Sequence, residues 1–161
     1  MELYNIFVDL IFELSITLGV GSSTFALTFY ILALTDGNVD ASERRFMHTV
    51  YFVLRIGMAL IALGLIASLF GAPLADGLTY TLQWALLAVI TINAILMTVH
   101  VMPMKYGPVI AGGSWYSLFF VTTLPVATWG TPTIIASYAG VLVFLYVLLN
   151  VLKALLHPKK S

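Results

Sequence analysis

One face of the first apolar segment carries two carboxylates followed by small and hydroxyl residues. They recur every three or four residues, at Asp9, Glu13, Thr17, Gly21, Thr24 and Thr28, with Ser22 beside them. At about 3.6 residues per turn, this spacing places them on one helix face. Acids inside membranes are costly and mark ion or proton paths, so the face is predicted to line such a path. The alternatives are a close-packing face, because small residues let membrane helices approach, and, for Asp9, a place among the headgroups.

A second polar pair, Arg55 and Asn93, lies in the next two apolar segments. Each is 19 residues from Leu74, in the connection between those segments, so antiparallel helices would hold the two at similar depth. An arginine at a span centre costs roughly 2.5–3.5 kcal/mol, so we expect Arg55 to face the bundle. We predict a polar, hydrated cavity between the first three helices, with Arg55 at its floor and Glu13 toward its outer mouth. Such a cavity would handle protons or a small ion; in the alternative, Arg55 bonds neutral hydroxyls and carbonyls in a dry bundle.

Two histidines show the same symmetry about Leu74, at the ends of these segments that lie farthest from it. His48 and His100 each lie 26 residues from Leu74, and Met97 and Met104 are close to His100 in the sequence. Haem iron accepts histidine or methionine ligands, and imidazole with thioether sulfur also suits a copper ion. A haem b- or metal-binding redox protein is therefore an alternative function. Against it stands the simpler interpretation of two histidines that anchor helix ends at the membrane interface.

Acidic residues also follow the first apolar segment, at Asp36, Asp40 and Glu43. Their spacing matches the second half of a calcium-binding EF-hand loop. The first half does not match, because its ligand positions hold leucines. The alternative is a turn followed by a capping residue at the start of the second helix.

The composition excludes a water-soluble domain and a nucleic-acid-binding protein. Of 161 residues, 61% are hydrophobic and 9% are charged, whereas a soluble domain has about 45–50% apolar and about 25% charged residues. The formal net charge is zero, and no cysteine is available for thiolate or disulfide chemistry. No motif indicates an activated nucleophile or a phosphate-binding loop, so we do not expect an enzyme.

Five apolar segments are long enough, or nearly so, to cross a membrane. They run about Tyr4–Leu34, Phe46–Phe70, Leu78–Val101, Val109–Thr128 and Thr133–Leu156. A span needs roughly 20 apolar residues, so the chain is predicted to be one all-α bundle of five transmembrane helices in a single domain, 1–161. The first segment is overlong. The fourth is short and interrupted by Pro125, with Trp115 and Trp129 near its ends as interfacial tryptophans; a re-entrant loop is the alternative there.

Basic residues predict the orientation of these spans. If the chain crosses the membrane five times, six basic residues fall on one side of it: Arg44, Arg45, Lys105, Lys153, Lys159 and Lys160. The positive-inside rule then places the N-terminus outside and the C-terminus in the cytoplasm, as expected for a bacterial or archaeal cytoplasmic membrane. A subunit this small would form a conduction path as a homo-oligomer in the lipid bilayer. A structural or accessory membrane subunit, with polar groups used only in packing, remains the third functional alternative.

Overall fold

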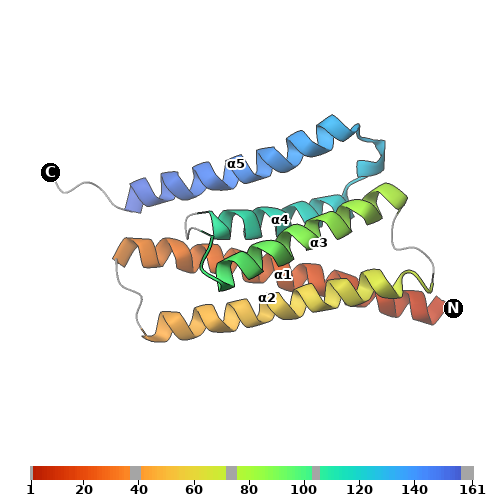
Figure 1. Cartoon of the computed structure of the whole chain (residues 1–161), viewed down its shortest axis with the longest axis horizontal. Helices are drawn as coiled ribbons and strands as arrows, with labels where there is room; N and C mark the ends of the chain where they lie inside the picture. Colours follow the sequence, from red (N-terminus) through yellow and green to blue (C-terminus); the bar gives the residue numbers. More distant parts are fainter. Residues whose placement is uncertain (1, 37–40, 72–75, 103–105, 157–161) are drawn as a thin grey trace.

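The computed structural model describes residues 2–36, 41–71, 76–102 and 106–156, and within these ranges the chain is helical with no strand (Figure 1). The elements are α1 (Glu2–Asp36), α2 (Ala41–Ala67), α3 (Gly77–Thr98), α4 (Gly107–Thr123), the short 3₁₀ helix η1 (Val126–Thr128) and α5 (Thr131–Leu156). The predicted all-α helical bundle is confirmed.

Four of the helices, α1, α2, α3 and α5, are long and apolar enough to cross a membrane, which fits an integral membrane protein. The 35 residues of α1 extend about 52 Å, well beyond the roughly 30 Å of a hydrocarbon core. The first helix is therefore overlong, as its sequence predicts. The 17 residues of α4 extend only about 25 Å.

The end of α4 confirms the predicted interruption at Pro125 and shortens the fourth helix. The helix stops at Thr123 instead of Thr128, and η1 follows as a separate turn. Pro125 explains the difference, because a residue that precedes proline is driven out of the helical region. Leu124 is accordingly extended, with φ −102° and ψ 151°.

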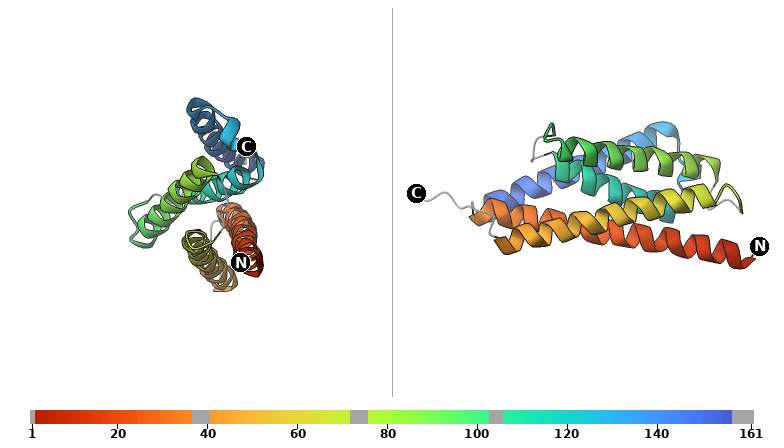
Figure 2. Two further views of the ribbon diagram at one scale, coloured as in Figure 1. Left: turned by 90° about the vertical axis from the view of Figure 1, so that its right-hand side faces the viewer. Right: turned by 60° about the horizontal axis from the view of Figure 1, so that its bottom comes forward.

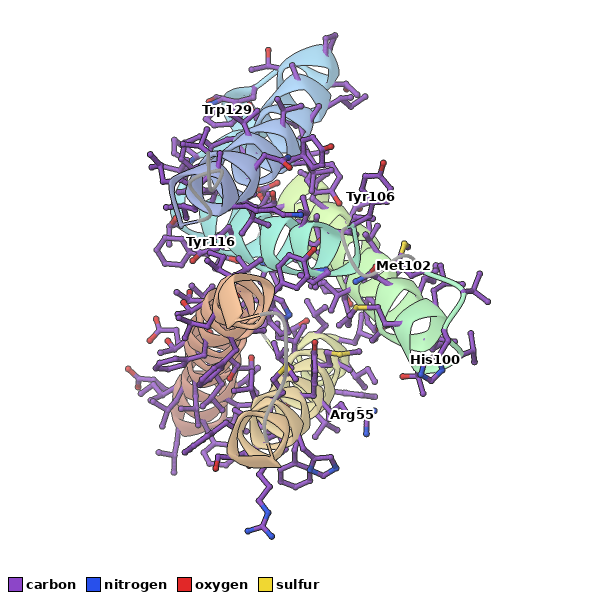
Figure 3. The ribbon with its side chains drawn as sticks, turned by 90° about the vertical axis from the view of Figure 1, so that its left-hand side faces the viewer. Arg55, His100, Met102, Tyr106, Tyr116 and Trp129 are labelled. Carbon is purple, nitrogen blue, oxygen red and sulfur yellow. The ribbon has the colours of Figure 1, made fainter. Side chains whose placement is uncertain are left out.

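Helix α4 lies at the centre of the bundle, between the α1–α2 pair on one side and α3 and α5 on others (Figure 2). Small residues allow this central position, because Gly112, Gly113, Ser114 and Ser117 are all buried. Helix α2 lies close to α3 where α2 ends and α3 begins, and the two diverge toward the other end of the bundle (Figures 2 and 3).

Helices α1 and α2 form a close antiparallel pair because glycine opens the surface of α2. A Cβ atom built on Gly57 would lie 3.3 Å from the carbonyl oxygen of Ser15, and one on Gly64 would lie 3.1 Å from the Phe12 ring. Both glycines face α1 at a spacing of seven residues, two turns of helix. This pairing is the small-residue packing that membrane helices use.

Trp115 occupies the junction of α1, α2 and α4. Its side chain is 1% exposed, and its ring covers Gly19 of α1 so closely that a Cβ atom there would overlap it. A Cβ atom on Gly57 of α2 would lie 3.4 Å from the same ring. The expectation of an interfacial tryptophan is therefore wrong for Trp115, which lies in mid-helix and fills the core.

Helix α3 begins at an N-cap that the sequence reasoning did not single out. One carboxylate oxygen of Asp76 accepts hydrogen bonds from the backbone N–H groups of Leu78 and Thr79, each at 3.0 Å. The other oxygen accepts the Thr79 hydroxyl at 2.8 Å. These bonds hold the pKa of Asp76 below its ordinary value. The cap therefore stabilises the helix start at neutral pH, and this contribution is lost as the pH falls through the lowered pKa.

Candidate functional site

The polar face of α1 lies on the outside of the chain. Asp9, Glu13, Thr17 and Thr24 are exposed, as is Thr28 further along the helix. The two carboxylates make no hydrogen bond or ion pair with any residue in the described ranges. The structure thus brings the predicted stripe together on one helix face, and that face points away from the bundle.

The threonine hydroxyls of this face donate to their own helix. Thr17 donates to the carbonyl oxygen of Glu13 at 2.9 Å, and Thr28 donates to that of Thr24 at 2.9 Å. A hydroxyl has one proton and two acceptor lone pairs. Since the proton is used within the helix, the outward side of each hydroxyl offers only acceptors. Together with the two carboxylates, this makes α1 present a surface suited to cations or protons.

Thr24 also ties this face to the central helix. Its hydroxyl lies 2.7 Å from the carbonyl oxygen of Val20 and 2.7 Å from the Tyr116 hydroxyl of α4. Because the single threonine proton is donated to Val20, the Tyr116 hydroxyl must be the donor in the second bond. Tyr116 lies on the part of α4 that faces α1 (Figure 3). The bond therefore holds the polar face in a fixed rotation relative to the bundle.

Ser22 belongs to the packing surface of α1. It is 8% exposed, and its neighbour Ser23 is 1% exposed. Ser23 donates to the carbonyl oxygen of Val20 at 3.0 Å, as serines in buried membrane helices do. For these two residues the structure supports the close-packing alternative over a place on a path.

Arg55 lies on an exposed part of α2, which corrects the expectation that it would turn into the bundle. Figure 3 shows its side chain pointing into the opening where α2 and α3 diverge. The contacts of Gly57 with Ser15 and Gly19 of α1 place Arg55, two residues earlier on the antiparallel helix α2, near the level of Gly19. The outward direction follows from the divergence of the two helices, which leaves space beside α2.

Asn93 does not meet Arg55. It is 3% exposed, and its amide nitrogen donates to the carbonyl oxygen of Gly107 at 3.0 Å and to the sulfur of Met97 at 3.7 Å. This amide thereby fastens α3 to the first turn of α4. Glu13 and Arg55 are exposed while Asn93 is buried against α4, so these residues do not surround a common cavity inside one copy of the chain.

The two histidines of the predicted haem or metal site are both exposed, on helices that diverge at their level (Figure 3). His100 follows the C-cap of α3 with φ 58°, the left-handed conformation of a residue that ends a helix. Its N–H donates to the carbonyl oxygen of Met97, and the N–H of Val101 donates to that of Leu96. These bonds form a Schellman motif, so His100 has a structural role at this position.

The methionines and acids of the other predicted metal sites are only partly covered by the structure. Met97 is engaged with Asn93 and packs on Gly107, whereas Met104 lies outside the described residues. In the predicted loop site, Asp36 ends α1 and Glu43 falls in the first turn of α2, while Asp40 lies outside the described residues. Within the described ranges, no three His, Asp or Glu side chains are grouped to hold a metal ion.

An absorption spectrum tests the haem and metal alternative directly. If His48 and His100 are paired axial ligands, the purified protein shows a Soret band that is lost in both His48→Ala and His100→Ala and kept in His157→Ala. We expect instead a colourless protein, because both side chains are exposed and α2 and α3 diverge at their level. A Soret band that depends on both residues would contradict this expectation.

Gln83 and Ser117, two buried residues that each have a polar atom without a partner among the described residues, were not predicted from the sequence. Gln83 of α3 is 1% exposed and donates from its amide nitrogen to the Thr122 hydroxyl of α4 at 3.3 Å, while its amide oxygen has no partner in the described chain. Ser117 of α4 is 6% exposed, and its hydroxyl likewise has no partner among the described residues. A glutamine inside an apolar span was the available signal. Ser117 carried no signal, because serines are common where membrane helices pack.

Comparison of the chain with protein-family models, with curated proteins and with solved structures finds no match. The fold and the candidate site define the class: in the part of the chain that the structure describes, an all-α protein with four candidate membrane-spanning helices and an exposed acidic and hydroxyl face on the first of them.

Proposed function

We propose that the chain is a subunit of a membrane channel or small transporter for protons or small cations, with a path formed between copies along the polar face of α1. The observation that carries the proposal is the exposure of Asp9, Glu13 and Thr17 within a candidate span. Left against lipid, these groups would be costly. Water held between neighbouring copies removes that cost.

The length of the face supports this function. From Asp9 to Thr28 the helix rises about 28 Å, nearly the roughly 30 Å of a hydrocarbon core. A path lined by this one helix face would therefore cross the whole apolar layer. Carboxylate rings select cations in channels, and the outward hydroxyl acceptors of the face have the same preference.

Exposed Arg55 supports an assembly of several copies. An arginine at the centre of a span facing lipid costs roughly 2.5–3.5 kcal/mol, and α2 holds Arg55 about midway along its candidate span, Arg45–Ala67. A neighbouring copy that supplies acceptors or water would remove this cost. A purely structural subunit would also bury these faces in an assembly but would conduct nothing, so a flux measurement separates the two functions.

Flux into liposomes is the test of the proposed function. Glu13→Gln keeps the shape of the side chain and removes its charge. Proton or small-cation flux is expected to fall on the order of tenfold, because about 1.4 kcal/mol of lost barrier stabilisation changes a rate by that factor. Glu2→Gln, in the exposed first turn of α1, is the matched control and leaves flux unchanged. Absence of flux in the wild-type protein, or equal flux in Glu13→Gln, would refute the proposal.

The orientation of the subunit is part of the same proposal. We place the N-terminus outside and the C-terminus in the cytoplasm of a bacterial or archaeal cell, on the basis of the six basic residues on one side of five spans. A reporter that is active only in the cytoplasm is expected to work when fused after Ser161. Activity of an exported reporter at that position instead would mean that α4 does not cross the membrane.

A further inference from the structure

Two side chains of opposite charge are left unpaired inside candidate spans of one copy. Glu13 of α1 and Arg55 of α2 are both exposed, and neither makes an ion pair or hydrogen bond with any residue that the structure describes. They do not meet within the copy, because Arg55 points into the opening between α2 and α3, whereas α1 packs on another side of α2 (Figure 3). Charges at such depth are paired or hydrated in membrane proteins, so each calls for a partner from outside the copy.

The depths of the two residues allow them to pair between copies. The rotation that relates the copies of a ring runs about the membrane normal and leaves the depth of every residue unchanged. Arg55 lies near the level of Gly19, and the helix rise from Gly19 to Glu13 is about 9 Å. Thr17, whose outward side offers only acceptors, lies between these two levels. The long arginine side chain extends along helix surfaces and so reaches toward both groups.

The surface of α2 leaves room for this reach. Ala59 is exposed one turn beyond Arg55, on the same side of the helix. It follows Gly57 by two residues, and the contacts of Gly57 with α1 place Ala59 level with the stretch between Glu13 and Thr17. Its short side chain leaves open the space through which the guanidinium group extends.

We propose that the side of α2 that carries Arg55 docks on the polar face of α1 in the next copy, where the guanidinium group binds the Glu13 carboxylate and the Thr17 hydroxyl. This inference rests on the assembly of copies that the proposed function requires. It joins two different faces, so the contact repeats from copy to copy and closes into a ring.

Charge favours this contact over one in which two α1 faces meet. Two facing α1 helices would bring like carboxylates together, which is unfavourable, and would leave Arg55 unpaired. In the proposed contact the two carboxylates of Asp9 and Glu13 face one guanidinium group, which leaves a net charge of −1 at each interface. A path along this interface therefore still favours cations.

Crosslinking of introduced cysteines tests the contact, because the chain has no cysteine of its own. Thr17→Cys and Ala59→Cys are placed in two separate chains, which keep both Glu13 and Arg55 and are reconstituted together. A short bismaleimide is expected to join one chain of each kind into a dimer. Thr17→Cys with Val143→Cys is the control and stays monomeric, because Val143 is exposed on α5, far from α2 (Figure 1). Dimers of the Thr17→Cys chain alone would show that α1 faces meet and would overturn the proposal.

Charge reversal tests whether the ion pair holds this contact. Arg55→Glu in the Ala59→Cys chain is expected to lower the yield of mixed dimer roughly tenfold, the change in a population that about 1.4 kcal/mol produces. Glu13→Arg in the Thr17→Cys chain is expected to restore it. If Arg55→Glu does not fold, Arg55→Gln lowers the yield in the same direction, while Arg45→Gln, exposed near the start of α2, leaves it unchanged. A yield that does not depend on the charge of Arg55 would overturn the proposal.

The crosslink reports the contact whether or not the assembly conducts. A mixed dimer without flux would refute the proposed conduction and keep the pairing of the two faces. Flux without a mixed dimer would refute the pairing and keep the proposed conduction.

Discussion

Replacing Gly19 with alanine is expected to destabilise the fold strongly, although the change adds one methyl group. The new Cβ atom would overlap the ring of Trp115, which is 1% exposed and also lies close to Gly57 of α2. Overpacking a closed core costs about 1–3 kcal/mol, and sometimes more. Thermal unfolding in detergent, followed by tryptophan fluorescence, measures the loss.

Gly21→Ala is the matched control on the same helix. A Cβ atom on Gly21 meets nothing within 4 Å, so this variant should be as stable as the wild type or gain roughly 0.5–1 kcal/mol from the better helix former. Trp115→Leu supplies the partner for a double-mutant cycle, and in that background Gly19→Ala should cost clearly less. A Gly19→Ala variant that unfolds at the wild-type temperature would show that Trp115 does not fill this recess.

The helices could be predicted because their cause is local. Runs of apolar residues are long enough to form spans, and the effect of Pro125 on its preceding residue needs no tertiary contact. The core could not be predicted in the same way. Gly19 and Trp115 are nearly a hundred residues apart in the sequence, and nothing in either neighbourhood indicates that one covers the other.

The sequence predicted which residues of the candidate site share a helix face. It did not predict whether each side chain points into the bundle or away from it. Spacing alone placed Asp9, Glu13 and Thr17 on one side of α1, and the structure keeps them together. The cost of charge in lipid predicted that Arg55 turns inward, yet the structure leaves it exposed. That rule gives the cost of a charged group that faces lipid. In the proposed assembly Arg55 faces a neighbouring copy instead, and the sequence of one chain does not show which residues face such a copy.

The second prediction concerns the water that the proposed path requires along the polar face of α1. The chain has no cysteine, so a single introduced thiol reports on its own position without background. Thr24 and Phe25 are both exposed, Phe25 by 61%. They are adjacent in depth and about 100° apart around the helix. Thr24 belongs to the polar face, and Phe25 lies on the apolar side of the exposed surface.

Labelling of Thr24→Cys and Phe25→Cys by a charged, membrane-impermeant thiol reagent in proteoliposomes is the most direct measurement of the central claim. A thiol reacts as its thiolate, which forms in water and not in hydrocarbon. The proposal predicts that Thr24→Cys is modified and that its modification reduces flux, whereas Phe25→Cys remains unmodified. Equal protection of both cysteines would place the polar face of α1 in a dry contact and contradict a conducting path between copies.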